Sequence, residues 1–160
     1  MPRKTFEQAI AAAKPLQLKA GLKAIKKGEG KGQIGAKDPK RILGSVAIDE
    51  DLKKTKADAE DNRWDYVIGY DLAGKAVAHF VEVHGAASGH DISKMQDKLQ
   101  WLVDFLQRPS QSRLAKLPRS IHWLASARND IKPHWPQYRD LVHMRSKHDL
   151  KGPVKQLELA

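Results

Sequence analysis

Apolar positions recur along the chain with two periodicities, one typical of strands and one typical of helices. Period-two alternation and short apolar runs predict strands at 41–48, at 121–125 and twice within 63–86, where Gly74 marks a tight turn. Helical spacing predicts a long helix that begins at Asp91, its expected N-cap, and ends before Pro109. Its buried stripe is expected to be Ile92, Met95, Leu99, Leu102 and Leu106. A last short helix is expected around 138–145.

The first forty residues combine a helix with a glycine-rich basic segment. Thr5 and Gln8 match a capping box, so a helix is expected to run through the alanines that follow, until Pro15 kinks or restarts it. The second half of this helix is expected to end at Gly28 and to present one apolar face made of Leu18, Leu22 and Ile25. Segments with neither periodicity are predicted to be loops: 28–40 (basic and flexible), 49–62 (solvated), 108–119 (basic) and a loose tail from Lys147.

The predicted elements follow one another in the order helix, strand, strand, strand, helix, strand, helix. Three sequential strands followed by a helical crossover to one further strand predict an α/β fold. Its small mixed sheet would have about four strands and be flanked by helices. A chain of 160 residues can bury one hydrophobic core, so a single domain over 1–160 is expected.

Composition and charge narrow the class of protein. The absence of cysteine excludes disulfides, thiolate zinc sites and thiol nucleophiles. No apolar run is long enough to cross a bilayer and the N-terminus lacks a signal-peptide core, so a soluble cytoplasmic protein without membrane association is expected. The net charge of +10 divides into +7 over residues 1–40, −4 over 41–107 and +7 over 108–160. Basic flanks around an acidic centre favour a polyanionic partner, because the flanks can neutralise phosphates while the acids hold a cation.

The predicted hairpin within 63–86 carries charged residues where a strand core would be apolar. If Leu72 pairs with Lys75 across the turn, Asp65 lies opposite Glu82, with the two side chains about 5 Å apart on one face. His84 shares that face and His79 points to the other one. Two interpretations of the acid pair remain open. Either a divalent cation lies between the carboxylates, or Lys94 or Lys98 of the next helix neutralises them as an ion pair.

These residues resemble the PD-(D/E)XK (restriction-endonuclease-like) nucleases. In that family an acid, a hairpin and a (D/E)-x-Lys motif at the end of an apolar strand precede a helix. Here RWD at 63–65 and VEVH at 81–84 occupy those places, and the order of predicted elements matches the family core over nearly the whole chain. The resemblance implies a restriction-endonuclease-like fold and an Mg²⁺ or Mn²⁺ ion held by Asp65, Glu82 and the carbonyl of Val83.

The chain departs from the family motif at one position, because His84 stands where the family has its lysine. An imidazole can act as a base or bind a metal, but it does not supply a permanent positive charge. Lys94 or Lys98 can replace the lysine from the helix, or catalysis has been lost. The family often has an acid on the first helix, which Glu7 would provide here; ordinary charge complementation of the helix dipole is the favoured role of Glu7.

Nucleic-acid contacts are expected from the basic loop at 108–119. It carries Arg108, Arg113, Lys116 and Arg119, which can follow a phosphate backbone or simply be solvated. Trp135 can stack on a base, although a structural role is favoured for it.

The function predicted from the sequence is therefore that of a metal-dependent endonuclease or exonuclease, with DNA rather than RNA as substrate. In this hypothesis Asp65 and Glu82 hold the metal while His84, Lys94 or Lys98 assist. The alternative is a catalytically inactive nuclease-fold protein that binds nucleic acid. A protein partner, or a second copy of the chain in a homodimer, is a further alternative.

Overall fold

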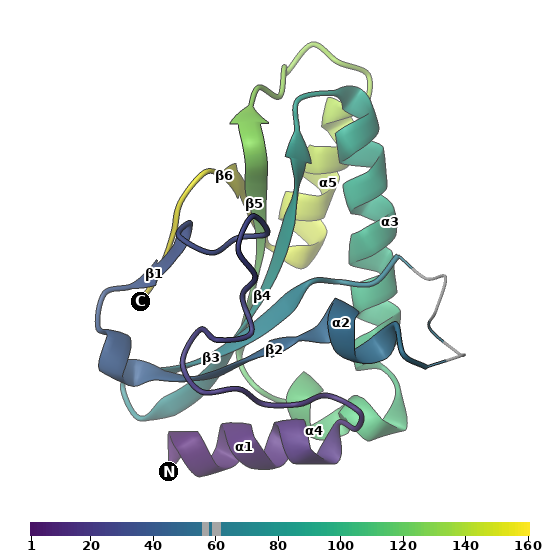
Figure 1. Ribbon diagram of the computed structural model, residues 1–160. Coiled ribbons are helices and arrows are strands. Elements are labelled where there is room, and N and C mark those ends of the chain that lie inside the picture. The colour runs from purple at the N-terminus through teal and green to yellow at the C-terminus, as the bar shows by residue number, and fades with distance from the viewer. Residues whose placement is uncertain (56–57, 59–61) are drawn as a thin grey trace.

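The computed structural model describes residues 1–55, 58 and 62–160 and shows a mixed α/β architecture (Figure 1). Its helices are α1 (Pro2–Ala12), α2 (Ile48–Leu52), α3 (Gly89–Leu106), α4 (Ser112–Ala115) and α5 (Tyr138–His148), with short 3₁₀ turns at Pro39–Arg41 and Pro109–Gln111. Its strands are β1 (Ile34–Ala36), β2 (Ile42–Ala47), β3 (Tyr66–Leu72), β4 (Lys75–Ala86), β5 (Arg119–Asn129), β6 (Leu150–Val154) and β7 (Leu157–Leu159). None of the helices in this part of the chain is long and apolar enough to span a membrane.

Five strands form the central sheet in the order β2-β3-β4-β5-β6. The pairs β2–β3 and β3–β4 are antiparallel, and a tight hairpin joins β3 to β4. The pairs β4–β5 and β5–β6 are parallel, because α3 and α5 carry the chain back between them. A second sheet pairs β1 with β7 in parallel, so that the C-terminus lies beside β1 (Figure 1).

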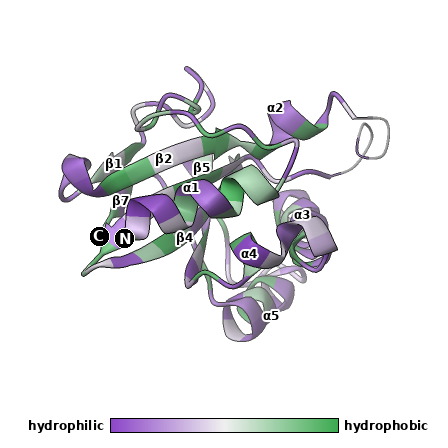
Figure 2. Cartoon of the chain, turned by 90° about the horizontal axis from the view of Figure 1, so that it is seen from below, coloured by the Kyte–Doolittle hydropathy of each residue, from purple (hydrophilic) through white to green (hydrophobic). Residues whose placement is uncertain are grey.

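The two faces of the central sheet bury separate clusters of side chains. One cluster packs α1, α3 and α5 against Val67, Ala78, Phe80 and Trp123. The other lies under the turns at 18–33 and under the small sheet, and includes Tyr66, Ile68, Val81 and Leu124. In Figure 2 much of the central sheet is coloured as hydrophobic, whereas much of α1 and α5 on the outside is hydrophilic.

The mixed α/β class and most of the predicted elements are confirmed. The strands expected at 41–48, within 63–86 and at 121–125 are β2, β3 with β4, and β5, and the long helix is α3. Its predicted stripe is buried throughout. Helix α3 begins at Gly89 rather than after Asp91: Ser88 is the N-cap, and Asp91 is its capping-box partner three residues later.

The predicted first helix is wrong in both its start and its length. Helix α1 begins at Pro2, with Met1 at its N-cap, so Thr5 lies inside the helix and donates its hydroxyl to the Met1 carbonyl. No helix forms between Pro15 and Gly28: residues 18–33 form turns, apart from Lys19, which bridges Ser45 of β2. Leu22 and Ile25 nevertheless pack on the sheet, because apolar residues in turns can be buried as well as those on a helix face.

Segments predicted as loops contain short regular elements. The expected loose tail from Lys147 forms the end of α5 and then β6 and β7, which Leu150 and Leu159 anchor in the two clusters. Within 28–40, Ile34–Ala36 forms β1, and within 108–119, Ser112–Ala115 forms α4. The solvated connection at 49–62 begins with α2, and its residues 56–57 and 59–61 lie outside the described part of the chain. Strands this short carry too few residues to show a pattern.

Candidate functional site

The structure brings the carboxylates of Asp65 and Glu82 together. The register of the hairpin is the predicted one: Leu72 pairs with Lys75, and the last pair of the ladder is Tyr66 with Val81. Asp65 immediately precedes β3, directly across from Glu82 on β4. The turn alone therefore determined which acids meet, since each residue along β3 has one partner on β4 once the turn is set.

Each carboxylate accepts a backbone N–H from the other strand. Asp65 N–H donates to Glu82 Oε1 at 3.1 Å, and Val83 N–H donates to Asp65 Oδ2 at 2.9 Å. These bonds continue the β3–β4 pairing one step beyond the end of the backbone ladder. They hold both side chains in fixed positions where the two strands begin to separate.

Lys98 of α3 completes the cluster. Its Nζ lies 2.8 Å from Glu82 Oε2 and 3.0 Å from the carbonyl oxygen of Arg63, to which it donates a hydrogen bond. The contact with Oε2 has the distance of an ion pair but not the angle of a hydrogen bond, so Oε2 lacks a hydrogen-bond partner within the described residues. The electrostatic attraction holds regardless of that angle, because it depends chiefly on distance.

Burial and mutual repulsion set the protonation of the acid pair. Glu82 is completely buried, and this desolvation, with the nearby Asp65 charge, raises the pKa of Glu82 well above its usual range. Burial also raises the pKa of Asp65, opposed by Lys98 and by the Val83 hydrogen bond. Lys98 therefore offsets only part of the cost of holding two negative charges in this place.

The other predicted site residues on β4 and α3 lie beside this cluster with other partners. The His84 Nδ1 lies 3.0 Å from the carbonyl oxygen of Gly85 and 3.8 Å from Asp91 Oδ1, at the start of α3. Lys94, one turn before Lys98, donates to Asn62 Oδ1 at 2.8 Å. Of the two lysines that the sequence proposed for the acid pair, the structure selects Lys98.

Glu7 does not belong to this cluster. It is exposed on α1 and lines a surface depression together with Lys40 and Asp71. Asp71 is six residues from Asp65 along β3, which corresponds to about 20 Å of extended strand. The role favoured for Glu7 from the sequence, a charge that complements the dipole at a helix N-terminus, is wrong, because Glu7 is the sixth residue of α1 and lies beyond its first turn.

The residues expected to contact nucleic acid divide into two groups. Arg108 forms a bidentate pair with Asp58, at 3.1 and 2.7 Å, and its guanidinium lies 5.1 Å from the centre of the Phe105 ring, so it is held at the surface of α3. Trp135 is half-buried against the core. Three side chains are exposed on or beside α4: Arg113, Lys116 and Arg119.

Arg63 is a member of the site to which the sequence assigned no role. Its guanidinium pairs with Asp49 of α2 at 2.9 Å and also donates to the Asp58 carbonyl, while its own carbonyl accepts from Lys98. Arg63 thereby links the acid pair to Asp58 and so to Arg108. Only its position before Trp64 and Asp65 in the RWD motif could have indicated this role.

The donor set suits a hard divalent cation with few protein ligands. Among the described residues, no three His, Cys, Asp or Glu side chains gather closely enough to enclose a metal. Two carboxylates and a carbonyl are nevertheless a common Mg²⁺ set, because this ion retains several waters or takes phosphate oxygens. The raised pKa values of Asp65 and Glu82 indicate that additional positive charge would stabilise the pair. In an extended strand the N–H and C=O of one residue point the same way, so the Val83 carbonyl is directed toward the Asp65 side.

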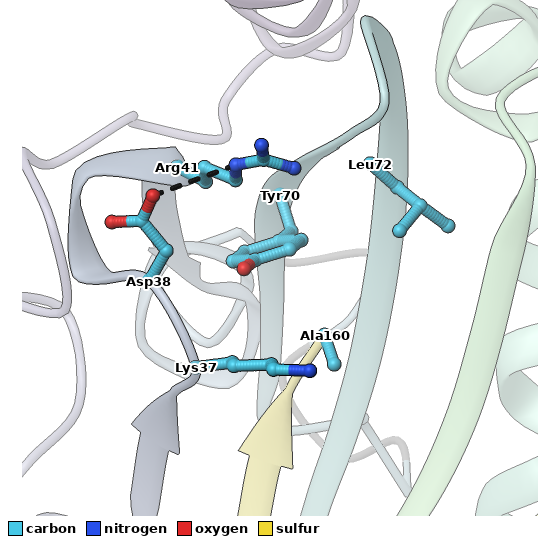
Figure 3. Close-up of a pocket in the computed structure, with 6 residues that line it drawn as sticks. All are labelled: Lys37, Asp38, Arg41, Tyr70, Leu72 and Ala160. Carbon is cyan, nitrogen blue, oxygen red and sulfur yellow. Dashed lines mark ion pairs between the residues drawn. The ribbon is translucent and has the colours of Figure 1, made fainter.

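A separate cavity lies near the hairpin turn and includes none of the predicted site residues. It is lined by Lys37, Asp38, Arg41, Tyr70, Leu72 and Ala160, with Asp38 paired to Arg41 at 3.5 Å (Figure 3). Tyr70 and Leu72 occupy the end of β3 that is remote from Asp65. This cavity is therefore distinct from the acidic cluster.

Comparison of the chain with protein-family models, with curated proteins and with solved structures gave no significant match. What the acidic cluster does must therefore be argued from its own geometry.

Proposed function

We propose that the protein is a metal-dependent nuclease of the PD-(D/E)XK type, which hydrolyses phosphodiester bonds in nucleic acid, with DNA preferred. The observation that carries the proposal is the meeting of Asp65 and Glu82 across β3 and β4, with the Lys98 ammonium 2.8 Å from Glu82. The proposal is also supported by the order of the surrounding elements, in which a helix and a meander are followed by a crossover helix and a parallel strand.

In this proposal each residue of the cluster has a distinct role. Asp65, Glu82 and the Val83 carbonyl would hold an Mg²⁺ or Mn²⁺ ion, which when bound polarises the scissile phosphate and acidifies water. Lys98 would take the place of the family's lysine and would bind phosphate oxygens beside Glu82. His84, which stands where the family has its lysine, would assist the attacking water as an imidazole base.

The proposal is tested by incubating purified protein with single-stranded DNA, duplex DNA and RNA in Mg²⁺ or Mn²⁺. Cleavage by the wild type is expected to fall by about 100-fold or more in Asp65→Asn, which retains the shape of the side chain. Glu7→Gln serves as the matched control, because this exposed glutamate lies far from the cluster. Equal cleavage by wild type and Asp65→Asn would contradict the proposal.

A second function is favoured by one observation, the burial of Glu82 against Lys98. The Glu82 side chain is 1% exposed and that of Lys98 is 15% exposed, so the lysine already offsets part of the charge that a bound metal ion would offset. A catalytically inactive nuclease-fold protein that binds nucleic acid would show this arrangement. It would bind DNA without cleaving it, Glu82→Gln would bind equally well, and Mn²⁺ would not raise its melting temperature. A cation-dependent rise in melting temperature that Glu82→Gln abolishes would favour the nuclease.

A further inference from the structure

Two histidines face each other on the side of the sheet opposite to the acidic cluster. His79 of β4 and His122 of β5 are each 6% exposed, and their rings stack with centroids 5.2 Å apart. The His79 Nδ1 lies 3.0 Å from the His122 Nε2, which is hydrogen-bond distance. The Tyr70 ring packs edge-on against His79. Apolar side chains would cover this part of the sheet at lower cost, because buried imidazoles lose their hydration.

The pair presents a fixed set of hydrogen-bonding groups. Burial lowers the pKa of His79 to about 4 and that of His122 to about 3, with Lys151 adding to both effects, so both rings are neutral at pH 7. A neutral imidazole has one N–H and one lone pair. Whichever ring donates in the shared hydrogen bond, the two outer nitrogens therefore comprise one donor and one acceptor.

A cavity of about 450 Å³ opens over the two rings. Ser120, which pairs with His79 across β4 and β5, and Lys151 of β6 contribute polar groups to its lining. The Lys151 Nζ lies 3.3 Å from the Ser120 Oγ, and within the described residues Lys151 has no carboxylate at ion-pair distance. Apolar side chains complete the lining, chiefly Leu72, Val77, Val154 and Leu157. An ammonium, a hydroxyl and an imidazole N–H thus border one open cavity, whose lining also includes Gln156, Glu158 and the C-terminal Ala160. Within the described residues Glu158 forms no ion pair with Lys151.

We propose that this cavity binds a small oxyanion, either a phosphate or a carboxylate group, through Lys151, Ser120 and the His79–His122 pair. Lys151 supplies the charge, and the hydroxyl and the outer imidazole N–H supply directed hydrogen bonds. The site is independent of the proposed nuclease activity, because strand parity places His79 and Glu82 on opposite faces of β4.

A metal ion is the other ligand that two imidazoles suggest, and the geometry opposes it. Each ring directs a nitrogen at the other ring, and Lys151 places a positive charge beside both of them. No third His, Cys, Asp or Glu joins them closely enough within the described part of the chain to complete a metal site. The oxyanion satisfies Lys151, whereas a cation would be repelled by it.

The test is a titration of the ¹⁵N-labelled protein with inorganic phosphate and, separately, with acetate, followed by imidazole NMR signals and by calorimetry. Saturable shifts of the His79 and His122 signals are expected with at least one of the two anions. The anion that binds with the higher affinity shows whether the ligand is a phosphate or a carboxylate. Lys151→Met and Ser120→Ala, both at or near the surface, are expected to weaken binding, by about tenfold for the lysine.

Lys54→Met is the matched control, because it removes an exposed lysine after α2, outside this cavity. It is expected to leave the affinity unchanged. The proposal is overturned if neither anion shifts the two imidazoles, if Lys54→Met weakens binding as much as Lys151→Met, or if Zn²⁺ alone produces the saturable shifts.

Discussion

At the level of single residues, the charge balance around Glu82 depends on Lys98, whose ammonium lies 2.8 Å from Oε2. Glu82 is buried, and the neighbouring Asp65 carboxylate repels its negative charge. Removing Lys98 would leave a carboxylate whose remaining partners are backbone and a second carboxylate, so Lys98 has a structural role whether or not the cluster is catalytic.

Lys98→Met is expected to lower the free energy of unfolding by about 3 kcal/mol, because the buried Glu82 carboxyl loses its partner and must either stay charged or take up a proton. Urea denaturation at pH 7 measures the change. Lys94→Met is the matched control. This lysine, one turn earlier on α3, donates to the neutral amide of Asn62, so its loss is expected to lower the free energy of unfolding by about 1 kcal/mol. Equal losses in the two variants would contradict the assigned role of Lys98.

Glu82→Gln is expected to change how stability depends on pH. The folded pKa of Glu82 lies above the ordinary 4.5, so above pH 4.5 the folded protein binds more protons than the unfolded chain. The carboxyl is therefore tolerated at low pH, and its contribution to the free energy of unfolding falls as the pH rises from 4.5 through the raised value. Within that pH window, the free energy of unfolding of Glu82→Gln rises relative to that of the wild type by about 1.4 kcal/mol for each pH unit.

Paired urea titrations of wild type and Glu82→Gln between pH 4 and pH 9, with a chelator present, measure this difference. The comparison with wild type is needed because His79 and His122, whose pKa values are lowered, give the opposite slope below pH 6.5. The exposed Glu7→Gln is expected to give a flat difference. If the difference in the free energy of unfolding between Glu82→Gln and wild type also stayed constant with pH, burial would not raise the pKa of the Glu82 carboxyl.

At the scale of elements, the hairpin was predictable because its turn and its alternation agree. Gly74 supplies the positive φ of 86° that the tight turn requires, and the predicted register follows from it. The two faces of β2 were harder to predict, because a bulge between Ile42 and Gly44 shifts the alternation of its side chains. Ile42 and Val46 would share a face under strict alternation, but the bulge places them in different clusters.

The docking of α1 on the sheet depends on a glycine of β3. A Cβ at Gly69 would lie 2.6 Å from the Phe6 ring, although the backbone there is of ordinary conformation. Gly69→Ala is expected to lower the free energy of unfolding by about 1–3 kcal/mol through overpacking. Gly35→Ala on β1, where a methyl group meets open space, is expected to change it by less than about 0.5 kcal/mol. Thermal or urea denaturation of both variants tests this, and similar values for the two would contradict the packing argument.

At the scale of the whole molecule, the separation of charge along the chain becomes an arrangement in space. The acidic centre supplies β3, β4 and α3, which form the Asp65–Glu82 cluster, and the basic flanks supply α1, the turns at 18–33 and the segment after α3. A polyanion bound near the cluster would be attracted by these flanks, with a strength that salt reduces.

The double variant Arg113→Ala/Lys116→Ala is expected to reduce the slope of log affinity for duplex DNA against log salt concentration. The expected reduction is about 0.9 for each phosphate that the variant no longer neutralises. Fluorescence anisotropy at several salt concentrations measures it. Lys54→Ala/Lys75→Ala removes the same charge from exposed positions outside the basic flanks and is expected to leave the slope unchanged. Equal effects of both double variants would assign the binding to net charge alone.

The sequence by itself determined the α/β class, the hairpin register and the identity of the acids that meet, because turn residues and period-two alternation act locally. Tertiary structure decided what the alternation cannot encode. Lys98 rather than Lys94 reaches Glu82, Arg108 is held by Asp58, and the C-terminal segment forms strands β6 and β7. Each of these depends on how far apart and at what angle separate elements pack, which is set by the shapes of two hydrophobic clusters assembled from the whole chain.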